Sequence, residues 1–199
     1  MEREEEEEDI VCLDPSFFMN NDYQLTTFTF GSHEIELFCL QSASSITGIL
    51  CSKFCHKVVL TDHNEEVLKI LKKNIELHAS PESLGNSAEL AAEKLEWGNS
   101  DQITQVMDKH SGGFDLILGA DICFQQSSVP LLFKTAERLL QVRGRGKCKF
   151  ILAYVSRARS MDTLILDEAS RHGMRMIEVD GTRSVVGNLQ GVIYEITLN

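Results

Sequence analysis

A short run of apolar residues, Val58–Leu60, is followed by a helical repeat of apolar positions. The run contains two β-branched residues and no polar one, which is typical of a strand buried on both faces of a sheet. Asp62 follows it closely, and Asn64 suits the N-cap of the next segment. Apolar residues then recur at helical spacing, at Val67, Leu68, Leu71 and Ile75. The pattern predicts a strand that ends in a carboxylate and leads into an amphipathic helix, which is half of a βαβ unit.

A second apolar run, Phe114–Phe124, has the same form, because its strand ends in the triplet Gly119–Asp121. Ser127, Ser128 and Pro130 predict the start of a helix behind it. The apolar side chains expected to face the sheet are Leu132, Phe133, Ala136, Leu139 and Leu140. The later elements predicted are a strand at Lys149–Val155, a helix at Met161–His172, and closing strands at Met174–Val179 and Gly191–Leu198. This alternation predicts an α/β fold with a Rossmann-like, doubly wound, mostly parallel sheet and an antiparallel closing strand.

The segment before these units predicts a β-hairpin. Gln24–Phe30 and Glu34–Leu40 alternate in polarity on either side of a short turn that contains Gly31. A helix is expected at residues 46–55, and residues 88–95 fit either a short helix or a strand. We therefore expect a disordered acidic tail at residues 1–9, a lead-in and hairpin at 10–44, and an α/β domain at 45–199 that forms one globular unit with the hairpin.

Composition narrows the class of protein. With 199 residues, 43% hydrophobic and 25% charged, the chain resembles an ordinary soluble globular domain. No apolar run reaches the roughly 18 residues that span a bilayer, so no membrane association is expected. The six cysteines form no CxxC pair and no zinc-ligand spacing, which favours reduced thiols in a cytoplasmic or nuclear protein and no metal.

The charge is strongly acidic and uneven. Of the net −11, residues 2–9 contribute −6 through seven acids and Arg3. A chain of this sign is a poor nonspecific binder of nucleic acid, and a basic protein or peptide is an easier partner. The acidic tail itself is expected to be a solvated segment, with a tether for a basic substrate as the alternative.

Two acids, Asp62 and Asp121, follow predicted strands of one sheet. In open α/β sheets the carboxyl ends of the strands face the ligand crevice, and an acid there commonly holds the hydroxyl pair of a ribose. The alternative for Asp62 is a cap on its own turn, and the alternative for Asp121 is a cap on the following helix. The chain lacks the phosphate-binding, hydrolase and zinc-protease motifs, and no GxGxxG precedes Asp62, which argues against phosphoryl transfer, hydrolysis and dinucleotide oxidation.

Three segments together resemble a known family. They are Val58–Asp62, Leu95–Trp97 and Leu118–Phe124, and with the closing strands they resemble the family 16, lysine-methyltransferase-like group of seven-strand S-adenosylmethionine-dependent methyltransferases. The resemblance covers roughly residues 34–199, with a gap. It implies methyl transfer from S-adenosyl-L-methionine to a lysine of a protein substrate.

The resemblance also implies roles for single residues. Asp62 would bind the ribose hydroxyls of the cofactor, Trp97 would flank its adenine, and Ala120 would lie against it; a core aromatic is the alternative for Trp97. Asp121 and Phe124 match a (D/E)xx(Y/F) motif that positions the accepting amine. Because methyl transfer is an in-line displacement, the protein mainly supplies alignment, and no nucleophilic side chain is required.

One departure from the family is large. Members carry a strand and a Gly-x-Gly loop before the helix that here begins near Ile46, whereas Gln41–Ser45 contains no glycine. About 30 residues, the size of a strand–loop unit, look absent between Ser44 and Ser45. Leu37–Leu40 could replace the missing strand, or the sheet could be disrupted. The sequence thus leaves two functions open, a methyltransferase impaired in this form and a noncatalytic interaction module that retains part of the fold.

Overall fold

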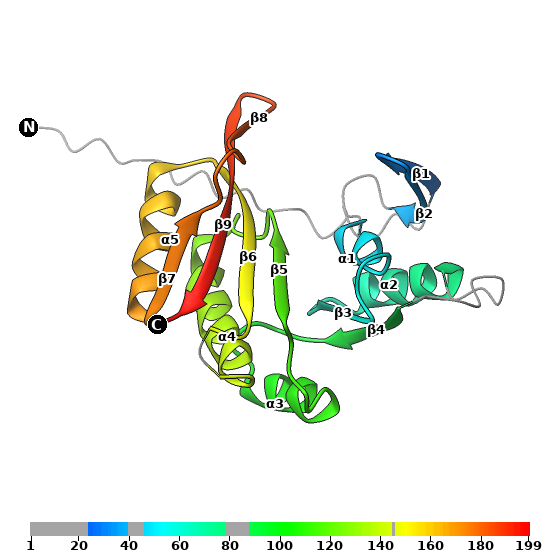
Figure 1. Cartoon of the computed structure of the whole chain (residues 1–199), viewed down its shortest axis with the longest axis horizontal. Helices are drawn as coiled ribbons and strands as arrows, with labels where there is room; N and C mark the ends of the chain where they lie inside the picture. Colours follow the sequence, from blue (N-terminus) through cyan, green and yellow to red (C-terminus); the bar gives the residue numbers. More distant parts are fainter. Residues whose placement is uncertain (1–23, 40–45, 79–87, 145) are drawn as a thin grey trace, which may run out of the picture. The chain divides into compact units, whose positions relative to one another are not determined.

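The computed structural model of the chain describes residues 24–39, 46–78, 88–144 and 146–199 (Figure 1). The predicted tail at residues 1–9 lies outside them. The described strands form a β1–β2 pair, a β3–β4 pair and a five-stranded sheet of order β5–β6–β9–β7 with β8 on β9. None of the described helices is long and apolar enough to cross a membrane. The elements in chain order are β1 (Gln24–Phe30), β2 (His33–Cys39), α1 (Ile46–Cys51), β3 (Lys57–Asp62), α2 (Glu65–His78), β4 (Glu89–Lys94), α3 (Ser100–Lys109), β5 (Leu116–Ala120), the 3₁₀ turn η3 (Gln126–Ser128), α4 (Val129–Gln141), β6 (Lys149–Ser156), α5 (Arg159–Arg171), β7 (Met174–Glu178), β8 (Ser184–Val186) and β9 (Leu189–Leu198).

The described residues divide into two compact units, one within Pro15–Ser111 and the other within Gly112–Asn199. We call them the N-terminal unit and the C-terminal unit and describe each by itself. The N-terminal unit contains the hairpin, the β3–β4 pair and helices α1 to α3. The C-terminal unit contains the five-stranded sheet with α4 and α5.

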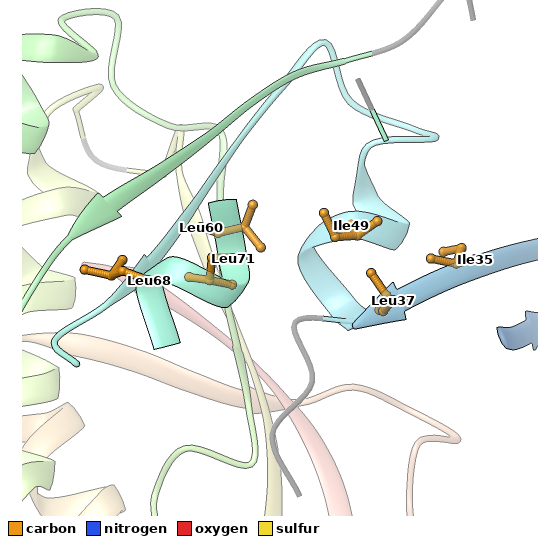
Figure 2. Packing of buried hydrophobic residues seen from close by; sticks show 6 residues of the cluster. All are labelled: Ile35, Leu37, Ile49, Leu60, Leu68 and Leu71. Atoms are coloured by element: carbon orange, nitrogen blue, oxygen red, sulfur yellow. The ribbon is translucent and has the colours of Figure 1, made fainter. Parts of the chain in front are cut away.

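The predicted hairpin is confirmed, and it is part of the core of the N-terminal unit. β1 and β2 pair antiparallel from Gln24 opposite Cys39 to Phe30 opposite His33, around a turn with Gly31 at φ 60°. Positive φ costs glycine little, which explains why it stands there. Figure 2 shows the buried cluster to which β2, α1, β3 and α2 contribute, formed by Ile35, Leu37, Ile49, Leu60, Leu68 and Leu71.

A side chain of α2 binds the second edge of β2. Asn74 is fully buried, its Oδ1 accepts from the Phe38 backbone N–H at 2.8 Å, and its Nδ2 donates to the Phe38 carbonyl at 3.1 Å. These are the two bonds that a neighbouring strand would make. Leu37 itself pairs with Thr26 of β1. The described part of β2 therefore belongs to the hairpin and does not replace a central strand, as the prediction for Leu37–Leu40 had allowed.

The strand–helix unit predicted around Asp62 is confirmed. β3 ends at Asp62 and α2 begins at Glu65, with Asn64 Oδ1 accepting from the backbone N–H groups of Glu66 (2.8 Å) and Val67 (3.4 Å). The segment that fitted either a helix or a strand is β4, which pairs parallel with β3 along its whole length.

Helix α1 ends four residues before the predicted Cys55. The Ser52 hydroxyl bonds the Ile49 carbonyl at 2.7 Å, and the backbone N–H of Lys53 turns to the Leu50 carbonyl, three residues back. A serine side chain that competes for a helix carbonyl in this way favours a tight turn over another helical turn.

The prediction was a Rossmann-like, mostly parallel sheet with an antiparallel closing strand, and the C-terminal unit has a mixed sheet whose closing strands are antiparallel. β5 pairs parallel with β6, while β9 lies antiparallel between β6 and β7. Helices α4 and α5 pack against each other and on this sheet (Figure 1). The short strand β8, which folds back on β9, was not predicted, because its three exposed residues carry no burial pattern.

Candidate functional site

One group of candidate residues follows the parallel strands of the N-terminal unit. Asp62, the last residue of β3, lies opposite Lys94, the last of β4. The Leu95 backbone N–H donates to the Asp62 carbonyl at 2.9 Å, which extends the pairing by one residue, and Trp97 follows two residues later. Because the strands are parallel, Asp62 and Trp97 lie at the same carboxyl edge.

The Asp62 carboxylate is held by its own turn. Its side chain is 31% exposed, and Oδ1 accepts from the Asn64 backbone N–H at 2.8 Å. Asp62 therefore does cap its turn, but with one oxygen only, since no described residue donates a hydrogen bond to Oδ2. The Oδ2 atom can therefore accept a hydrogen bond from a hydroxyl group of a ligand.

Trp97 lies in a turn that is stabilised by a backbone hydrogen bond between its neighbours. The Asn99 backbone N–H donates to the Glu96 carbonyl at 3.1 Å, and Gly98 has φ 82°, a conformation that suits glycine. Trp97 is partly buried and is not one of the buried core side chains. Trp97 is thus not a fully buried core aromatic.

The second group follows β5 in the C-terminal unit. Gly119 has no room for a side chain, because a Cβ there would lie 2.6 Å from Ile122 Cδ1 and 3.1 Å from Phe150 Cε2. Ala120 is exposed, and the Asp121 backbone N–H donates to the Ala153 carbonyl at 2.8 Å, which carries the pairing with β6 to the end of the strand.

Asp121 has an unusual backbone. Its φ is 51°, and of the described residues other than glycine it alone has a positive φ. The left-handed conformation costs a non-glycine residue roughly 1–2 kcal/mol, although aspartate tolerates it better than most. Strain of this kind persists where the surroundings enforce it and is more frequent at functional sites.

The Asp121 carboxylate is bound by Arg157, the residue after β6. Arg157 Nη1 donates to Oδ1 and Nη2 donates to Oδ2, each at 2.6 Å, in a bidentate pair. Arg157 Nη1 also donates to the Val155 carbonyl at 3.3 Å. Hydrogen bonding to Asp121 raises the pKa of the Arg157 guanidinium, which therefore stays charged. The two side chains are 40% and 44% exposed, and pairs so exposed contribute only about 0–1 kcal/mol to stability.

The structure does not show Asp121 as a helix cap. Neither the N-cap of η3, Gln125, nor that of α4, Ser128, carries a side-chain cap hydrogen bond, and both Asp121 oxygens face Arg157. The motif partner Phe124 is 54% exposed, whereas Cys123 beside it is 2% exposed. Burial, with a smaller effect of Asp121, raises the pKa of the Cys123 thiol to about 12, which leaves it an inert thiol.

Sequence reasoning missed Arg157. The available signal was its place two residues after a third predicted strand, Lys149–Val155, as Asp62 comes two residues after the apolar run Val58–Leu60. The structure thus gives two groups, Asp62 with Trp97 in the N-terminal unit, and Ala120, Asp121, Phe124 and Arg157 in the C-terminal unit.

A hollow of about 380 Å³ in the C-terminal unit is lined by Glu137, His172 and the last residues of β9, at the edge of the sheet opposite Asp121. Within the described ranges, no three His, Cys, Asp or Glu side chains are grouped as a metal ion would need.

The sequence matches one family model and two known proteins, all described as lysine methyltransferases. The family model described as lysine methyltransferase matches residues 16–172. Protein-lysine N-methyltransferase EFM3 of Chaetomium thermophilum is 27% identical over 139 residues, covering 67% of this chain and 39% of that protein. Protein N-lysine methyltransferase METTL21A of Danio rerio is 26% identical over 147 residues, covering 73% of this chain and 61% of that protein. The chain thus spans less than two thirds of the length of either relative.

Solved structures show the same fold at low identity. A methyltransferase from Pyrococcus furiosus is similar with a TM-score of 0.53 and 16% identity, over 78% of this chain and 71% of that one. Magnesium protoporphyrin IX methyltransferase from Synechocystis PCC 6803, solved with bound S-adenosylmethionine, is similar with a TM-score of 0.52 and 11% identity, over 78% and 65%. The fold is that of the Rossmann-like α/β methyltransferases.

Proposed function

This chain belongs to the lysine methyltransferase family, and on that premise we propose that it is an S-adenosylmethionine-dependent methyltransferase of protein lysine. The observation that carries the proposal is the placement of two acids, Asp62 and Asp121, each at the carboxyl end of a strand in a parallel pair. That is where α/β sheets bind nucleotide-like ligands.

The cofactor half of the proposal rests on the N-terminal unit and Ala120. Asp62 Oδ2 would accept from a ribose hydroxyl, while Oδ1 remains bound to the Asn64 N–H and keeps the carboxylate in place. The role proposed for Trp97, which is partly buried, is to flank the adenine, and the role proposed for Ala120, which is exposed at the end of β5, is to lie against the cofactor. When bound, the cofactor supplies an electrophilic methyl group on a sulfonium.

The amine half rests on Asp121 and Phe124. An exposed carboxylate and an exposed ring three residues apart can orient the end of a lysine side chain, the first by a hydrogen bond and the second by contact with its methylenes and ammonium. The amine must lose its extra proton before it can attack, so this site has to accept a neutral amine as well as an ammonium.

We propose further that this form of the chain is impaired. Residues 41–45 contain no glycine, and side chains keep the backbone of a loop from approaching a cofactor closely. Losing about three loop hydrogen bonds of about 1 kcal/mol each weakens binding on the order of a hundredfold.

The same observations favour a second candidate, a noncatalytic interaction module that keeps the fold without the cofactor. In either case the partner would be a protein, consistent with the acidic balance of the chain, and a cytoplasmic or nuclear location is part of the proposal.

The test is methyl transfer from isotope-labelled S-adenosylmethionine, at millimolar concentration, to the lysine peptide Ac-Gly-Lys-Gly-amide. Label on the peptide above the level of the Asp121→Ala variant supports a methyltransferase. A folded chain that transfers no label and shows no cofactor binding would establish the noncatalytic module instead.

A further inference from the structure

The bidentate pair between Arg157 and Asp121 has a consequence for any amine that binds at this edge. A lone carboxylate stabilises an ammonium and so holds the amine in the protonated form. A guanidinium on the same carboxylate repels that ammonium and compensates the negative charge. The pair therefore sets which protonation state of an amine the site prefers.

Arg157 would influence the protonation state of a bound amine through its contact with the Asp121 carboxylate. Both carboxylate oxygens receive a guanidinium N–H at 2.6 Å, which fixes the plane of the carboxylate at a residue whose backbone is already in the left-handed region. Each oxygen keeps further acceptor capacity, since a carboxylate offers about four lone-pair positions. A neutral amine can thus still donate a hydrogen bond to Asp121 while Arg157 is in place.

We propose that Arg157 is a positioning residue that compensates the charge of Asp121, so that the site takes a lysine side chain as the neutral amine. The proposal rests on the methyltransferase function proposed above. The nitrogen lone pair forms the bond to the methyl carbon, the carbon–sulfur bond breaks and its electron pair stays on sulfur, and the surplus proton of the lysine goes to water. An ammonium has no lone pair for this step.

Two other titratable groups near the pair, Tyr154 and Cys123, stay uncharged between pH 6 and 10 because the pKa of each is raised. Burial, followed by the hydrogen bond to Asp162, raises the pKa of Tyr154 on β6. Asp162 of α5 accepts from the Tyr154 hydroxyl at 2.6 Å and from the Ser156 hydroxyl at 2.9 Å. Cys123 stays a thiol to a pH of about 12. A change in amine preference between pH 6 and 10 would therefore report on Asp121 and Arg157.

The experiment is a binding cycle that needs neither cofactor nor turnover. The probe is n-butylammonium chloride, which has the end of a lysine side chain, titrated at pH 7 against sodium chloride of equal ionic strength. Backbone amide shifts of Asp121, Cys123 and Phe124 report binding to the full chain. The variants are Arg157→Gln, Asp121→Asn and the double variant, with Arg159→Gln as the control, because it removes an exposed arginine two residues away.

Removing Arg157 should tighten n-butylammonium binding about three- to tenfold, the effect of deleting one nearby, partly screened charge. The gain should vanish in the Asp121→Asn background, and Arg159→Gln should stay close to wild type. Three results would each overturn the proposal and leave an ordinary surface ion pair. They are unchanged n-butylammonium binding in Arg157→Gln, no binding in any variant, and an equal gain in affinity when Asp121 is replaced as well. The fold of each variant is checked by its amide spectrum.

A second readout separates this inference from the proposed function. In methyl transfer to Ac-Gly-Lys-Gly-amide, Arg157→Gln should move the rising limb of the pH–rate profile up by about 0.5–1 pH unit, because the bound lysine holds its proton longer. Arg157→Lys, which keeps the charge, should leave the limb in place. If the binding cycle behaves as expected but no variant transfers methyl, the proposed function fails and the role of Arg157 in amine binding stands.

Discussion

Asp62 and Asp121 each end a strand in a parallel pair, but different partners hold their carboxylates. Asp62 is bound by a backbone N–H two residues along its own turn. Asp121 is bound by Arg157, which is 36 residues away and directly follows the neighbouring strand β6, and the backbone of Asp121 is in the left-handed region. The first acid keeps a whole oxygen for a ligand, whereas both oxygens of the second share a cation.

This difference matches the two tasks proposed for them. Binding a hydroxyl pair requires a fixed acceptor with capacity to spare, which a short turn supplies. Handling an amine that must lose a proton requires control of charge, which a second charged side chain can supply. Changes made near Asp62 should therefore act through local geometry, and changes near Asp121 through electrostatics and the packing of neighbouring strands.

The largest expected effect concerns the core beneath the first acid. Leu37→Ala removes a fully buried side chain of β2 from the cluster that β3 and α2 share, and should lower the free energy of unfolding of the N-terminal unit by about 2–5 kcal/mol. Hydrogen exchange of the α2 and β3 amides measures it. Leu25→Ala in β1, at a side chain that is 50% exposed, is the matched control and should change little. Equal protection in the two variants would show that the hairpin is not part of this core.

Next comes the acid itself. Asp62→Ala should weaken S-adenosylmethionine binding by about 1.5–3 kcal/mol, the range for hydrogen bonds to a charged group, with little change in stability. Chemical-shift titration at millimolar cofactor can follow even weak binding. Asp121→Ala should stay within about twofold of wild type. Identical affinities for wild type and Asp62→Ala would rule out the ribose role.

The corresponding change beside the second acid is Gly119→Ala. Its Cβ would meet Ile122 and Phe150, so either side chain has to move, at a cost of about 1–3 kcal/mol in unfolding free energy. Chemical denaturation measures the loss. Gly112→Ala, where nothing lies within 4 Å of the new Cβ, is the control. A loss of unfolding free energy no greater than that of the control would mean that the side chains of Ile122 and Phe150 move aside at no measurable cost.

The smallest expected effect is that of Asn64→Ala, which tests the cap of α2 separately from the backbone hydrogen bond that holds the Asp62 carboxylate. Asn64→Ala removes the side-chain cap of α2 but keeps the backbone N–H that binds Asp62. Thermal unfolding should show a loss of about 1 kcal/mol, the usual worth of such a cap, while cofactor affinity stays the same. A large drop in affinity would mean that the cap, and not the N–H, positions Asp62.

The comparison also explains what could be predicted from the sequence. The strand, the Asn64 cap and the helix around Asp62 were predictable because all their signals lie within twenty residues. The pairing of Asp121 with Arg157 depends on β5 and β6 lying side by side, which no local pattern encodes. For the same reason the hairpin was predictable, but its packing on α2 through Asn74 was not.

Two further elements show the limits of periodicity. Glu89–Lys94 has two alanines among charged residues, a pattern that fits a helix as well as a strand, and its parallel pairing with β3 decides the outcome. Leu37–Leu40 is apolar enough for a central strand, yet the residues of β2 pair with β1 and with Asn74. In both cases the pairing of the segment is determined by a partner that is distant in sequence.

The most direct test of the account is a calorimetric titration of the 199-residue chain with S-adenosylmethionine. Binding should be weak, with a dissociation constant on the order of a hundred micromolar, because residues 41–45 offer no glycine to approach the cofactor. Micromolar binding together with measurable methyl transfer would contradict this expectation, and would show that this serine-rich segment serves the cofactor as well as a glycine loop.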